Sequence, residues 1–441
     1  MAAGYFEAGK VPRASFELFV RELPPSRGYL VAAGLVSAVN YLENLHYTQD
    51  QIEYLRSLPA LEGIAPGFFD EYLARVRFTG DMWAVPEGTP IFATEPLIRV
   101  TAPLAEAQLV ETALLSVILF QTSVASKARR IAEAAAGRAV IEFGGRRAHG
   151  PEAALYAARA ALLGGCQATS NLEAGCRFGV PVSGTMAHSW VMAHPDELTA
   201  FRRYMDVYGR RSVLLVDTYD CKAAVRLIGE AGLRPDGVRL DSGDLAGLSR
   251  DVRGELDAWG LTETKVLVSG DLDEHRVAEL VASGAPIDGF GVGTSLTTVA
   301  DAPALSGVYK LVEIERDGRM VPLMKLSDGK RTLPGGKQVW RMNDLTQNAQ
   351  DVVGLAGELG PKGALPLMRQ VMRSGISLEP KRSIEDLREF CLKAVGSLPV
   401  AVRRHSDPEV YPVVLSDELE QLTWKVRQAL YDNRGKGFPE E

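Results

Sequence analysis

Residues 237–271 read GVRLDSGDLAGLSRDVRGELDAWGLTETKVLVSGD, and this stretch decides the fold class. Two short apolar runs, at 237–241 and 265–269, each end next to an aspartate, and a helix-like segment at 243–259 separates them. An apolar run, a helical segment and a second apolar run form the pattern of a βα unit with parallel strands. The stretch therefore predicts a parallel β/α architecture.

The same alternation extends in both directions from this stretch. Seven apolar runs end in polar tips, with helix-like segments between most of them, and the runs lie at 139–143, 167–170, 180–183, 213–217, 237–241, 265–269 and 287–291. Seven units in a row predict an α/β fold, either a parallel barrel or a doubly wound sheet. We favour an irregular parallel β/α barrel of about seven strands, because catalytic groups of barrels lie at the carboxyl ends of their strands.

The flanks of the barrel segment have a different character. Residues 1–103 and 303–345 mix helix-like and strand-like segments, and an Asp-Gly turn at 317–318 joins two strand-like runs. Because the two flanks share this character, we expect them to form a second, discontinuous α+β domain beside a barrel at 104–302. Residues 346–441 are expected to be a C-terminal helical extension, from helical patterns at 383–395 and 416–431.

Composition excludes several classes of protein. The formal net charge is −7 and no long Lys/Arg run occurs, which argues against a partner that is nucleic acid or a membrane surface. No apolar stretch approaches the roughly 20 residues that span a bilayer, and the first residues lack the features of a secretory signal. The four cysteines are scattered without a CxxC pair, so we expect ordinary thiols, no structural zinc and a cytoplasmic location.

Several tips carry side chains suited to catalysis. His188, after the third run, can act as a base or as a nucleophile toward phosphorus, or it is a structural histidine. Arg239 and Asp241 stand two apart on a strand and so point to the same side, as ligand-binding groups or as an ion pair. Asp217 and Asp271 end two other runs, where a single carboxylate is usually a helix N-cap.

Two further tips favour anion binding. Glycines around Gly293 let backbone N–H groups approach a phosphate, and their position after the seventh run matches the phosphate site of many barrels. Phe143 and Arg146 could bring an aromatic face and a cation to one ligand, or be a core side chain and a solvated one. No GxxxxGK[ST] sequence is present, so any use of ATP would not follow the P-loop design.

In their order along the chain these tips resemble the motifs of nicotinate phosphoribosyltransferases. The matching segments are FGGRR at 143–147, TSN at 169–171, GTMAH at 184–188, DTYD at 217–220, RLDSGD at 239–244, SGD at 269–271 and GVGT at 291–294. Further matches at 309–312 (YKLV) and 334–337 (PGGK) extend the resemblance to most of the chain. No single segment is diagnostic, but the ordered set is specific.

The resemblance implies an enzyme of NAD synthesis from nicotinate. Its substrates would be nicotinate, 5-phosphoribosyl 1-pyrophosphate (PRPP) and ATP, with Mg²⁺, and its products nicotinate mononucleotide, pyrophosphate, ADP and phosphate. It assigns transient phosphorylation by ATP to His188. It also assigns nicotinate contacts to Thr185 and Arg239, ribose 5-phosphate contacts to Gly293 and Thr294, and contacts near ribose hydroxyls or Mg²⁺–pyrophosphate to Asp241 and Asp271.

The same resemblance completes the expected site. Phe143, Arg146, Asp217 and Gly270 join the substrate-binding residues, and the metal would come with the substrates rather than sit in a protein cage. Ser170 takes the place of an Asp found in a related nicotinamide-using family, and a neutral side chain avoids repelling the carboxylate of nicotinate. A homodimer with shared active sites is also implied.

The first residues depart from the family pattern. Family members usually begin with an Asp-x-Tyr-x-x-Thr-Met segment whose tyrosine stacks on the pyridine ring, commonly across a dimer interface, whereas this sequence starts MAAGYF. Either the start was assigned too far downstream, or another aromatic side chain substitutes. Phe143 could still stack on one face of the ring.

Three other functions are alternatives to this one. A barrel aldolase or isomerase would normally need a Lys for a Schiff base or a Glu base at a strand end, whereas the tips here carry Asp, His, Arg and Thr. A non-catalytic nucleotide sensor would bind ligands without releasing pyrophosphate. Quinolinate phosphoribosyltransferase, the nearest chemical neighbour, would need a more cationic pocket for two carboxylates and no ATP-linked histidine.

Overall fold

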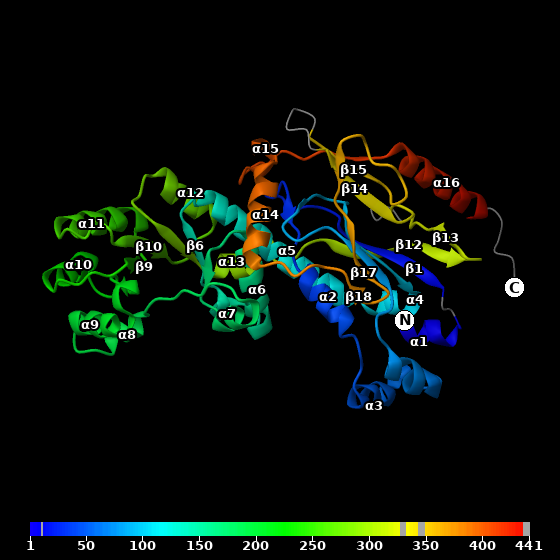
Figure 1. Cartoon of the computed structure of the whole chain (residues 1–441), viewed down its shortest axis with the longest axis horizontal. Helices are drawn as coiled ribbons and strands as arrows, with labels where there is room; N and C mark the ends of the chain where they lie inside the picture. Colours follow the sequence, from blue (N-terminus) through cyan, green and yellow to red (C-terminus); the bar gives the residue numbers. More distant parts are fainter. Residues whose placement is uncertain (10–11, 327–331, 343–348, 435–441) are drawn as a thin grey trace. The chain divides into compact units, whose positions relative to one another are not determined.

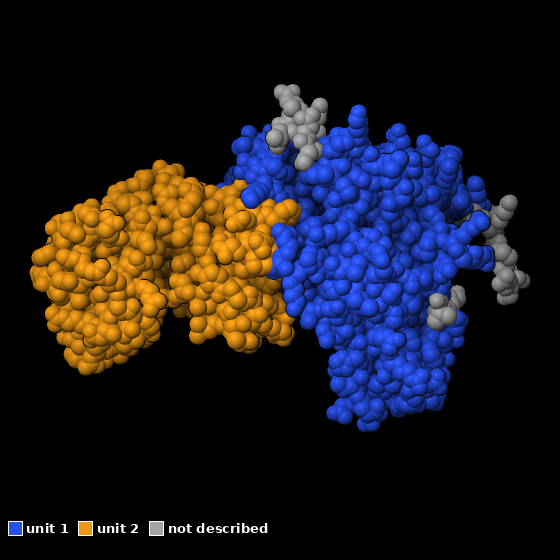
Figure 2. Space-filling model, viewed as in Figure 1, with its two compact units in different colours: residues 1–122, 304–382, 393–441 blue, residues 123–303, 383–392 orange. Residues whose placement is uncertain are grey.

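The computed structural model describes residues 1–9, 12–326, 332–342 and 349–434. The chain divides into two compact units, coloured separately in Figure 2. Unit 1 comprises residues 1–122, 304–382 and 393–441, and unit 2 comprises residues 123–303 and 383–392. The expected domain limit between 345 and 346 lies outside the described residues.

Unit 2 is built on a parallel sheet of six described strands in the order β7-β6-β11-β10-β9-β8. The strands are β6 (Ala139–Glu142), β7 (Ala168–Thr169), β8 (Val213–Leu215), β9 (Gly237–Leu240), β10 (Lys265–Ser269) and β11 (Gly289–Val292). Because β11 pairs with β6, the last strand lies beside the first, as in a barrel. The α/β class and the parallel, barrel-like sheet are therefore confirmed.

The third of the seven predicted strands is a correction. Residues 180–183 make only an isolated parallel bridge, between Thr169 and Val182. Pro181 lies in the middle of this run and has no N–H to donate, which restricts it to the edge of a sheet. The described sheet thus has six strands rather than seven, and the barrel is open between the bridge and β8.

Helices alternate with these strands as predicted. They are α5 (Glu111–Ala134), which begins in unit 1, α6 (Pro151–Gly164), α7 (Leu172–Phe178), α8 (His188–Met192), α9 (Glu197–Tyr208), α10 (Cys221–Glu230), α11 (Leu245–Ala258), α12 (Glu274–Ala282) and α13 (Thr294–Thr298), with the 3₁₀ turns Gly145–Arg147 and Gly209–Arg211. The side chains of Asp220 and Asp273 cap α10 and α12. Helix α11 packs on β9 and β10 and against α10 (Figure 1).

Unit 1 contains mainly antiparallel sheets. The largest has the order β13-β12-β1-β5-β3-β17-β18, formed by β1 (Arg13–Val20), β3 (Asp81–Ala84), β5 (Pro96–Pro103), β12 (Gly307–Arg316), β13 (Arg319–Pro322), β17 (Arg369–Arg373) and β18 (Ile376–Ser377). The others are β16 (Ala364–Pro366), β14 (Lys337–Met342), β15 (Asp351–Leu355) and β19 (Val413–Leu415), and the pair β2 (Leu30–Val31) and β4 (Pro90–Ile91). Strands from both flanks of the barrel segment therefore share one sheet.

The helices of unit 1 are short apart from the last. They are α1 (Ala2–Glu7), α2 (Leu35–Glu43), α3 (Gln49–Ser57), α4 (Leu104–Leu109), α15 (Val400–Arg403) and α16 (Asp417–Arg434), with a 3₁₀ turn at Pro59–Leu61 and a π-helix at Phe68–Leu73, while α14 (Ile384–Gly396) belongs partly to each unit. No helix within the described ranges is long and apolar enough to cross a membrane.

Residues 346–441 are not the helical extension that the sequence predicted. Besides α14, α15 and α16, this region contains β15, β16, β17, β18 and β19. These strands have two to five residues, too few for the alternation of apolar and polar side chains to become visible. Part of α14 also belongs to unit 2.

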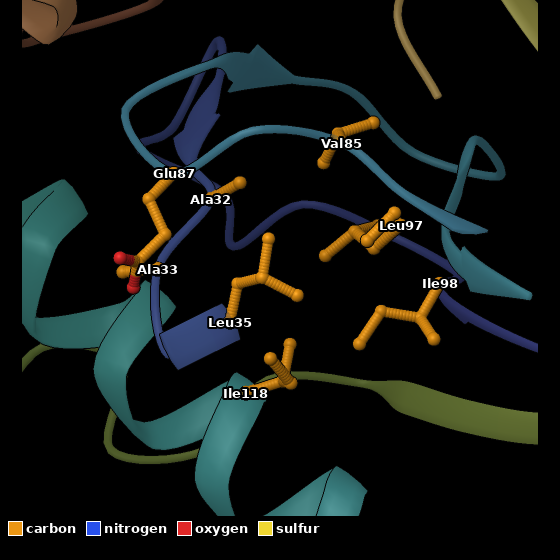
Figure 3. Close-up of a pocket in the computed structure, with 9 residues that line it drawn as sticks. Ala32, Ala33, Leu35, Val85, Glu87, Leu97, Ile98 and Ile118 are labelled. Carbon is orange, nitrogen blue, oxygen red and sulfur yellow. The ribbon is translucent and has the colours of Figure 1, made fainter. Parts of the chain in front are cut away.

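The core of unit 1 leaves one small cavity between β5, α2 and α5. Its volume is about 10 Å³, room for about one water molecule. Figure 3 shows that Leu35, Leu97, Ile98 and Ile118 line it, with Glu87 as the polar member. The cavity is a packing void and is too small to hold a substrate.

Candidate active site

The polar tips of unit 2 gather at the carboxyl ends of its parallel strands. Each of six strands is followed directly by expected site residues: Phe143 after β6, Ser170 after β7, Asp217 shortly after β8, Asp241 after β9, Gly270 and Asp271 after β10, and Gly293 and Thr294 after β11. Since parallel strands end at the same edge of a sheet, these side chains border one mouth.

His188, the first residue of α8, lies beside two of these tips. Its Nε2 atom is 4.0 Å from Asp217 Oδ1 and 4.0 Å from Asp241 Oδ2. Its Nδ1 atom is 3.2 Å from the hydroxyl oxygen of Thr218. The imidazole remains 40% exposed, so a ligand can reach it.

The two carboxylates are held firmly. Asp217 accepts hydrogen bonds from the backbone N–H of Asp241 at 2.7 Å and from the Ser242 hydroxyl at 3.3 Å. Asp241 accepts a short hydrogen bond from the Ser269 hydroxyl. The other oxygen of Asp217, Oδ1, is buried without a hydrogen-bond partner among the described residues. An acceptor left in this state beside His188 is available to a ligand.

Arg239 brings a cation to the same mouth. Its Nη2 donates to the carbonyl of Met186 at 3.2 Å, while its buried Nε finds no acceptor in the described part of the chain. Burial lowers the pKa of Arg239. The negative charges of Asp241 and Asp217 oppose this shift, and the positive charge of Arg146 adds to it. Arg146 thus adds a second positive charge to the surroundings of Arg239, and two such charges favour the binding of an anion.

The first and seventh tips are in contact. A side chain at Gly291 would meet the ring of Phe143 at 2.5 Å and the Cβ of Ser269 at 3.2 Å, so only glycine lets the aromatic ring lie here. At the end of β10, Asp271 has a φ of 45°. A non-glycine residue in this conformation stores strain, which is common at functional sites.

The remaining expected residues occupy the rim. Ser170 and Thr294 are exposed, and Thr185 lies in the segment between β7 and α8 with its hydroxyl donating to the Met186 carbonyl at 3.1 Å. His194, six residues after His188, is 2.7 Å from the Trp190 carbonyl through its Nδ1 and packs on the Trp190 ring. Its contacts are those of a structural histidine.

Three residues with no role assigned from the sequence help to hold the site together. Thr218 contacts His188, Ser269 holds Asp241, and the buried Glu142 binds the loops around β6. Each stands next to a tip that the sequence did identify, so adjacency to a strand end was the available signal. A position next to a strand end does not predict which side chain from another part of the sheet each of these three residues contacts.

No group of three or more His, Cys, Asp or Glu side chains in the described ranges is arranged to hold a metal ion. The four cysteines are free: Cys166 and Cys391 are buried, Cys221 is partly buried and Cys176 is exposed.

Family models match nearly the whole chain. The N-terminal domain of nicotinate phosphoribosyltransferase matches residues 1–119, the nicotinate phosphoribosyltransferase family matches residues 139–345, and the C-terminal domain of that enzyme matches residues 336–423.

Individual relatives agree with the family models. A nicotinate phosphoribosyltransferase of Mycobacterium tuberculosis is 42% identical over 97% of this chain and 92% of its own length. The Bacillus subtilis protein of the same name is 42% identical over 95% of this chain and 91% of its own length. The human one is 31% identical over 96% of this chain and 94% of its own length.

Solved structures show the same fold. The crystal structure of human nicotinic acid phosphoribosyltransferase superposes with a TM-score of 0.84 at 30% identity, covering 97% of this chain and 98% of that one. A nicotinate-nucleotide pyrophosphorylase from Pyrococcus furiosus gives a TM-score of 0.72 at 24% identity over 90% and 92% of the two chains, a likeness of fold alone.

Proposed function

The chain belongs to the nicotinate phosphoribosyltransferase family, and from this premise we propose how its mouth performs the reaction. The enzyme is a nicotinate phosphoribosyltransferase of NAD biosynthesis, acting on nicotinate and PRPP. We propose which residues bind these substrates, that ATP is used through His188, and that Mg²⁺ is needed.

One observation carries the proposal. His188, with Nε2 at 4.0 Å from the carboxylates of Asp217 and Asp241, shares one mouth with the cations Arg146 and Arg239. Nicotinate is an anion and PRPP a polyanion, so cations are needed to bind both despite the acidic chain. A phosphate-accepting nucleophile next to an anion site is the combination that an ATP-coupled transfer requires.

Nicotinate binding falls to Arg239, Thr185 and Phe143. The buried Nε of Arg239 has a proton to donate and no acceptor among the described residues, and the carboxylate of nicotinate would supply one. The ring of Phe143, lying over Gly291, offers a face on which the pyridine ring stacks. Arg146 adds a second positive charge near the carboxylate.

Phosphoribosyl transfer needs groups around the ribose and its leaving group. Gly293 and Thr294, after β11, are proposed to hold the 5-phosphate through backbone N–H groups. As the bond from C1′ to pyrophosphate breaks, positive charge develops on the ribose and negative charge on the leaving group. Asp241 and Asp271 lie at adjacent strand ends, where carboxylates can bind ribose hydroxyls and stabilise the positive charge.

Mg²⁺ would reach this mouth bound to pyrophosphate or to ATP, where it neutralises developing phosphate charge. The residues present fit such a cation, because Asp217 Oδ1 is a buried oxygen without a hydrogen-bond partner among the described residues. One or two carboxylates are the usual protein contribution to Mg²⁺ that is otherwise held by phosphates and water. Asp217 and Asp241 are the proposed contributors.

Incubation with nicotinate, PRPP and Mg²⁺ tests the function directly. We expect nicotinate mononucleotide by chromatography, a faster rate when ATP is added, and no product when EDTA removes the metal. Full activity in EDTA would contradict the metal requirement, and a wild-type rate that does not change when ATP is added would contradict the coupling.

Ser170 is proposed to set the choice of base. We expect a higher kcat/KM for nicotinate than for nicotinamide, and Ser170→Asp should lower the value for nicotinate by roughly 10- to 100-fold, because like charges then face each other. Nicotinamide should gain, since a carboxylate accepts from its amide. Ser170→Ala is the matched control and should change the ratio of the two values little. A wild-type enzyme that prefers nicotinamide would overturn this proposal.

The assembly is proposed to be a homodimer with shared active sites, on the resemblance stated above. Exposed apolar side chains support it: Tyr219, two residues after Asp217, is 69% exposed, and Leu172 and Met192, in α7 and α8, are 75% and 66% exposed. Apolar groups gathered near a polar mouth are typical of an interface. A monomeric mass by light scattering would contradict this assembly.

A further inference from the structure

Glu142 is a buried carboxylate on which three substrate-binding segments converge. It ends β6, and its side chain is 1% exposed. One oxygen, Oε2, accepts from the Thr169 hydroxyl at 2.5 Å. The other, Oε1, accepts from the Thr297 hydroxyl at 3.2 Å and from the backbone N–H of Gly144. The donors belong to the end of β7, to α13 and to the turn after β6.

Each of these donors stands beside a residue of the proposed site. Thr169 precedes Ser170, and its hydroxyl oxygen also accepts from the Asn171 N–H at 3.0 Å, which folds the backbone around Ser170. Thr297 lies on α13, one helical turn after Thr294. Gly144 follows Phe143. The carboxylate therefore connects the parts of the mouth proposed for the base and for the 5-phosphate.

The packing around this carboxylate is tight. A Cβ atom at Gly144 would lie 1.6 Å from the Thr297 hydroxyl oxygen and 2.7 Å from the Gly293 carbonyl. The turn after β6 and the start of α13 thus interlock, and a shift of one moves the other. A change in the bonds to Glu142 would be transmitted to Gly293, where the 5-phosphate is proposed to bind.

A carboxylate is the only ordinary side chain of this length that satisfies all three donors. It has two oxygens that accept and no hydrogen that donates. No lysine or arginine pairs with Glu142 in the described part of the chain, so the hydrogen bonds alone compensate the burial of its charge. Because a buried charge is costly, a role beyond simple packing accounts for it better than stability does.

We propose that Glu142 is a positioning residue, which orients the Ser170 segment toward the base through Thr169 and the Gly293–Thr294 segment toward the 5-phosphate through Thr297. The inference rests on the proposed function, since it takes those two segments as the binding sites for nicotinate and phosphate. It predicts that the hydrogen bonds of Glu142 to Thr169 and to Thr297 can be weakened separately. Loss of the first should affect the binding of nicotinate, and loss of the second the binding of the 5-phosphate.

Equilibrium binding of nicotinate and of ribose 5-phosphate, measured by calorimetry on the full chain, tests this separation. Thr169→Val should raise the Kd for nicotinate about three- to tenfold and leave that for ribose 5-phosphate within about twofold, and Thr297→Val should do the reverse. Glu142→Gln should raise the Kd for nicotinate less than Thr169→Val does, because the Thr169 hydroxyl can rotate and accept from the amide N–H₂ that replaces Oε2. The serine variants at both threonines keep the hydroxyl and should bind as wild type does.

The outcomes separate a positioning role from a structural one. Valine variants that lower the melting temperature but leave both Kd values unchanged, or that raise both equally, would overturn the inference. Wild-type protein that binds neither ligand would instead overturn the proposed function itself. Serine variants as weak as the valine variants would also count against the inference, since the hydroxyls would then not matter.

Discussion

Replacing His188 by alanine is expected to reduce transfer of the γ-phosphate of ATP to the protein to background, at least about a hundredfold below wild type. The imidazole is the nitrogen nucleophile among the side chains that the structure brings together at this mouth. Its Nδ1 contacts Thr218 at 3.2 Å, and its Nε2 faces two carboxylates at 4.0 Å. Label from γ-³²P-ATP, counted on the protein after rapid quenching in alkali, measures the effect.

The phosphorylated histidine would change the charge of the mouth. A phosphoryl group adds negative charge and strong acceptor oxygens, which cations such as Arg239 and any Mg²⁺ present would bind. Loss of His188 should therefore also remove the acceleration of mononucleotide synthesis by ATP while leaving slow, ATP-independent turnover.

His194→Ala provides the matched control. This histidine is on the same short segment, but its Nδ1 is 2.7 Å from the Trp190 carbonyl and its ring packs on Trp190. The variant should be labelled to the wild-type extent. Equal labelling of the His188 variant and the wild type would refute phosphorylation at His188.

A second large effect is expected on stability, from the buried charges of unit 2. Glu274, at the start of α12, is fully buried. Its Oε1 accepts from Arg130 Nε at 2.9 Å, and its Oε2 forms an ion pair with Lys127 Nζ at 2.5 Å. Lys127 also contacts Asp301 at 2.8 Å. Glu274→Gln removes the negative charge that compensates two buried cations, so the free energy of unfolding should fall by about 3–5 kcal/mol.

The same network predicts how stability depends on pH. Burial alone would raise the pKa of Glu274, but Lys127 and Arg130 outweigh it and lower the value from 4.5 to about 2. A carboxyl whose folded pKa is depressed contributes its stability above the unfolded pKa and loses it as pH falls through the folded one. The Glu274 contribution, about 3 kcal/mol for such a shift, should therefore disappear between about pH 4.5 and 2.

Urea unfolding followed by circular dichroism at pH 7 and at pH 3 measures both effects. The wild type should lose stability toward pH 3, and the Glu274→Gln variant should lose less. Glu279→Gln, on the same helix, removes a 68%-exposed partner of Arg276 and should change stability by no more than about 0.5 kcal/mol. A Glu274 variant as stable as this control would show that the buried network contributes nothing.

Much of the barrel was predictable from local pattern. The limits of β10 at Lys265–Ser269 coincide with the predicted ones, and α11 at Leu245–Ala258 begins and ends within two residues of the predicted 243–259, because each element carries its own periodicity and its own end signals. The prediction was wrong for 180–183, where an apolar run was read as a strand although Pro181 prevents full pairing. It was also wrong for the short strands β15 to β19, whose few residues carry no visible period.

The sequence by itself determined the α/β class, the order of the strand ends and the residue types at each of them. Both kinds of pattern are local, since side chains alternate along a strand and repeat every 3.6 residues along a helix. The tertiary structure alone decided which tips touch, because the partners are far apart in the chain. Thr297 meets Glu142 across 155 residues, and such a contact depends on how strands pair around the sheet rather than on any signal beside either residue.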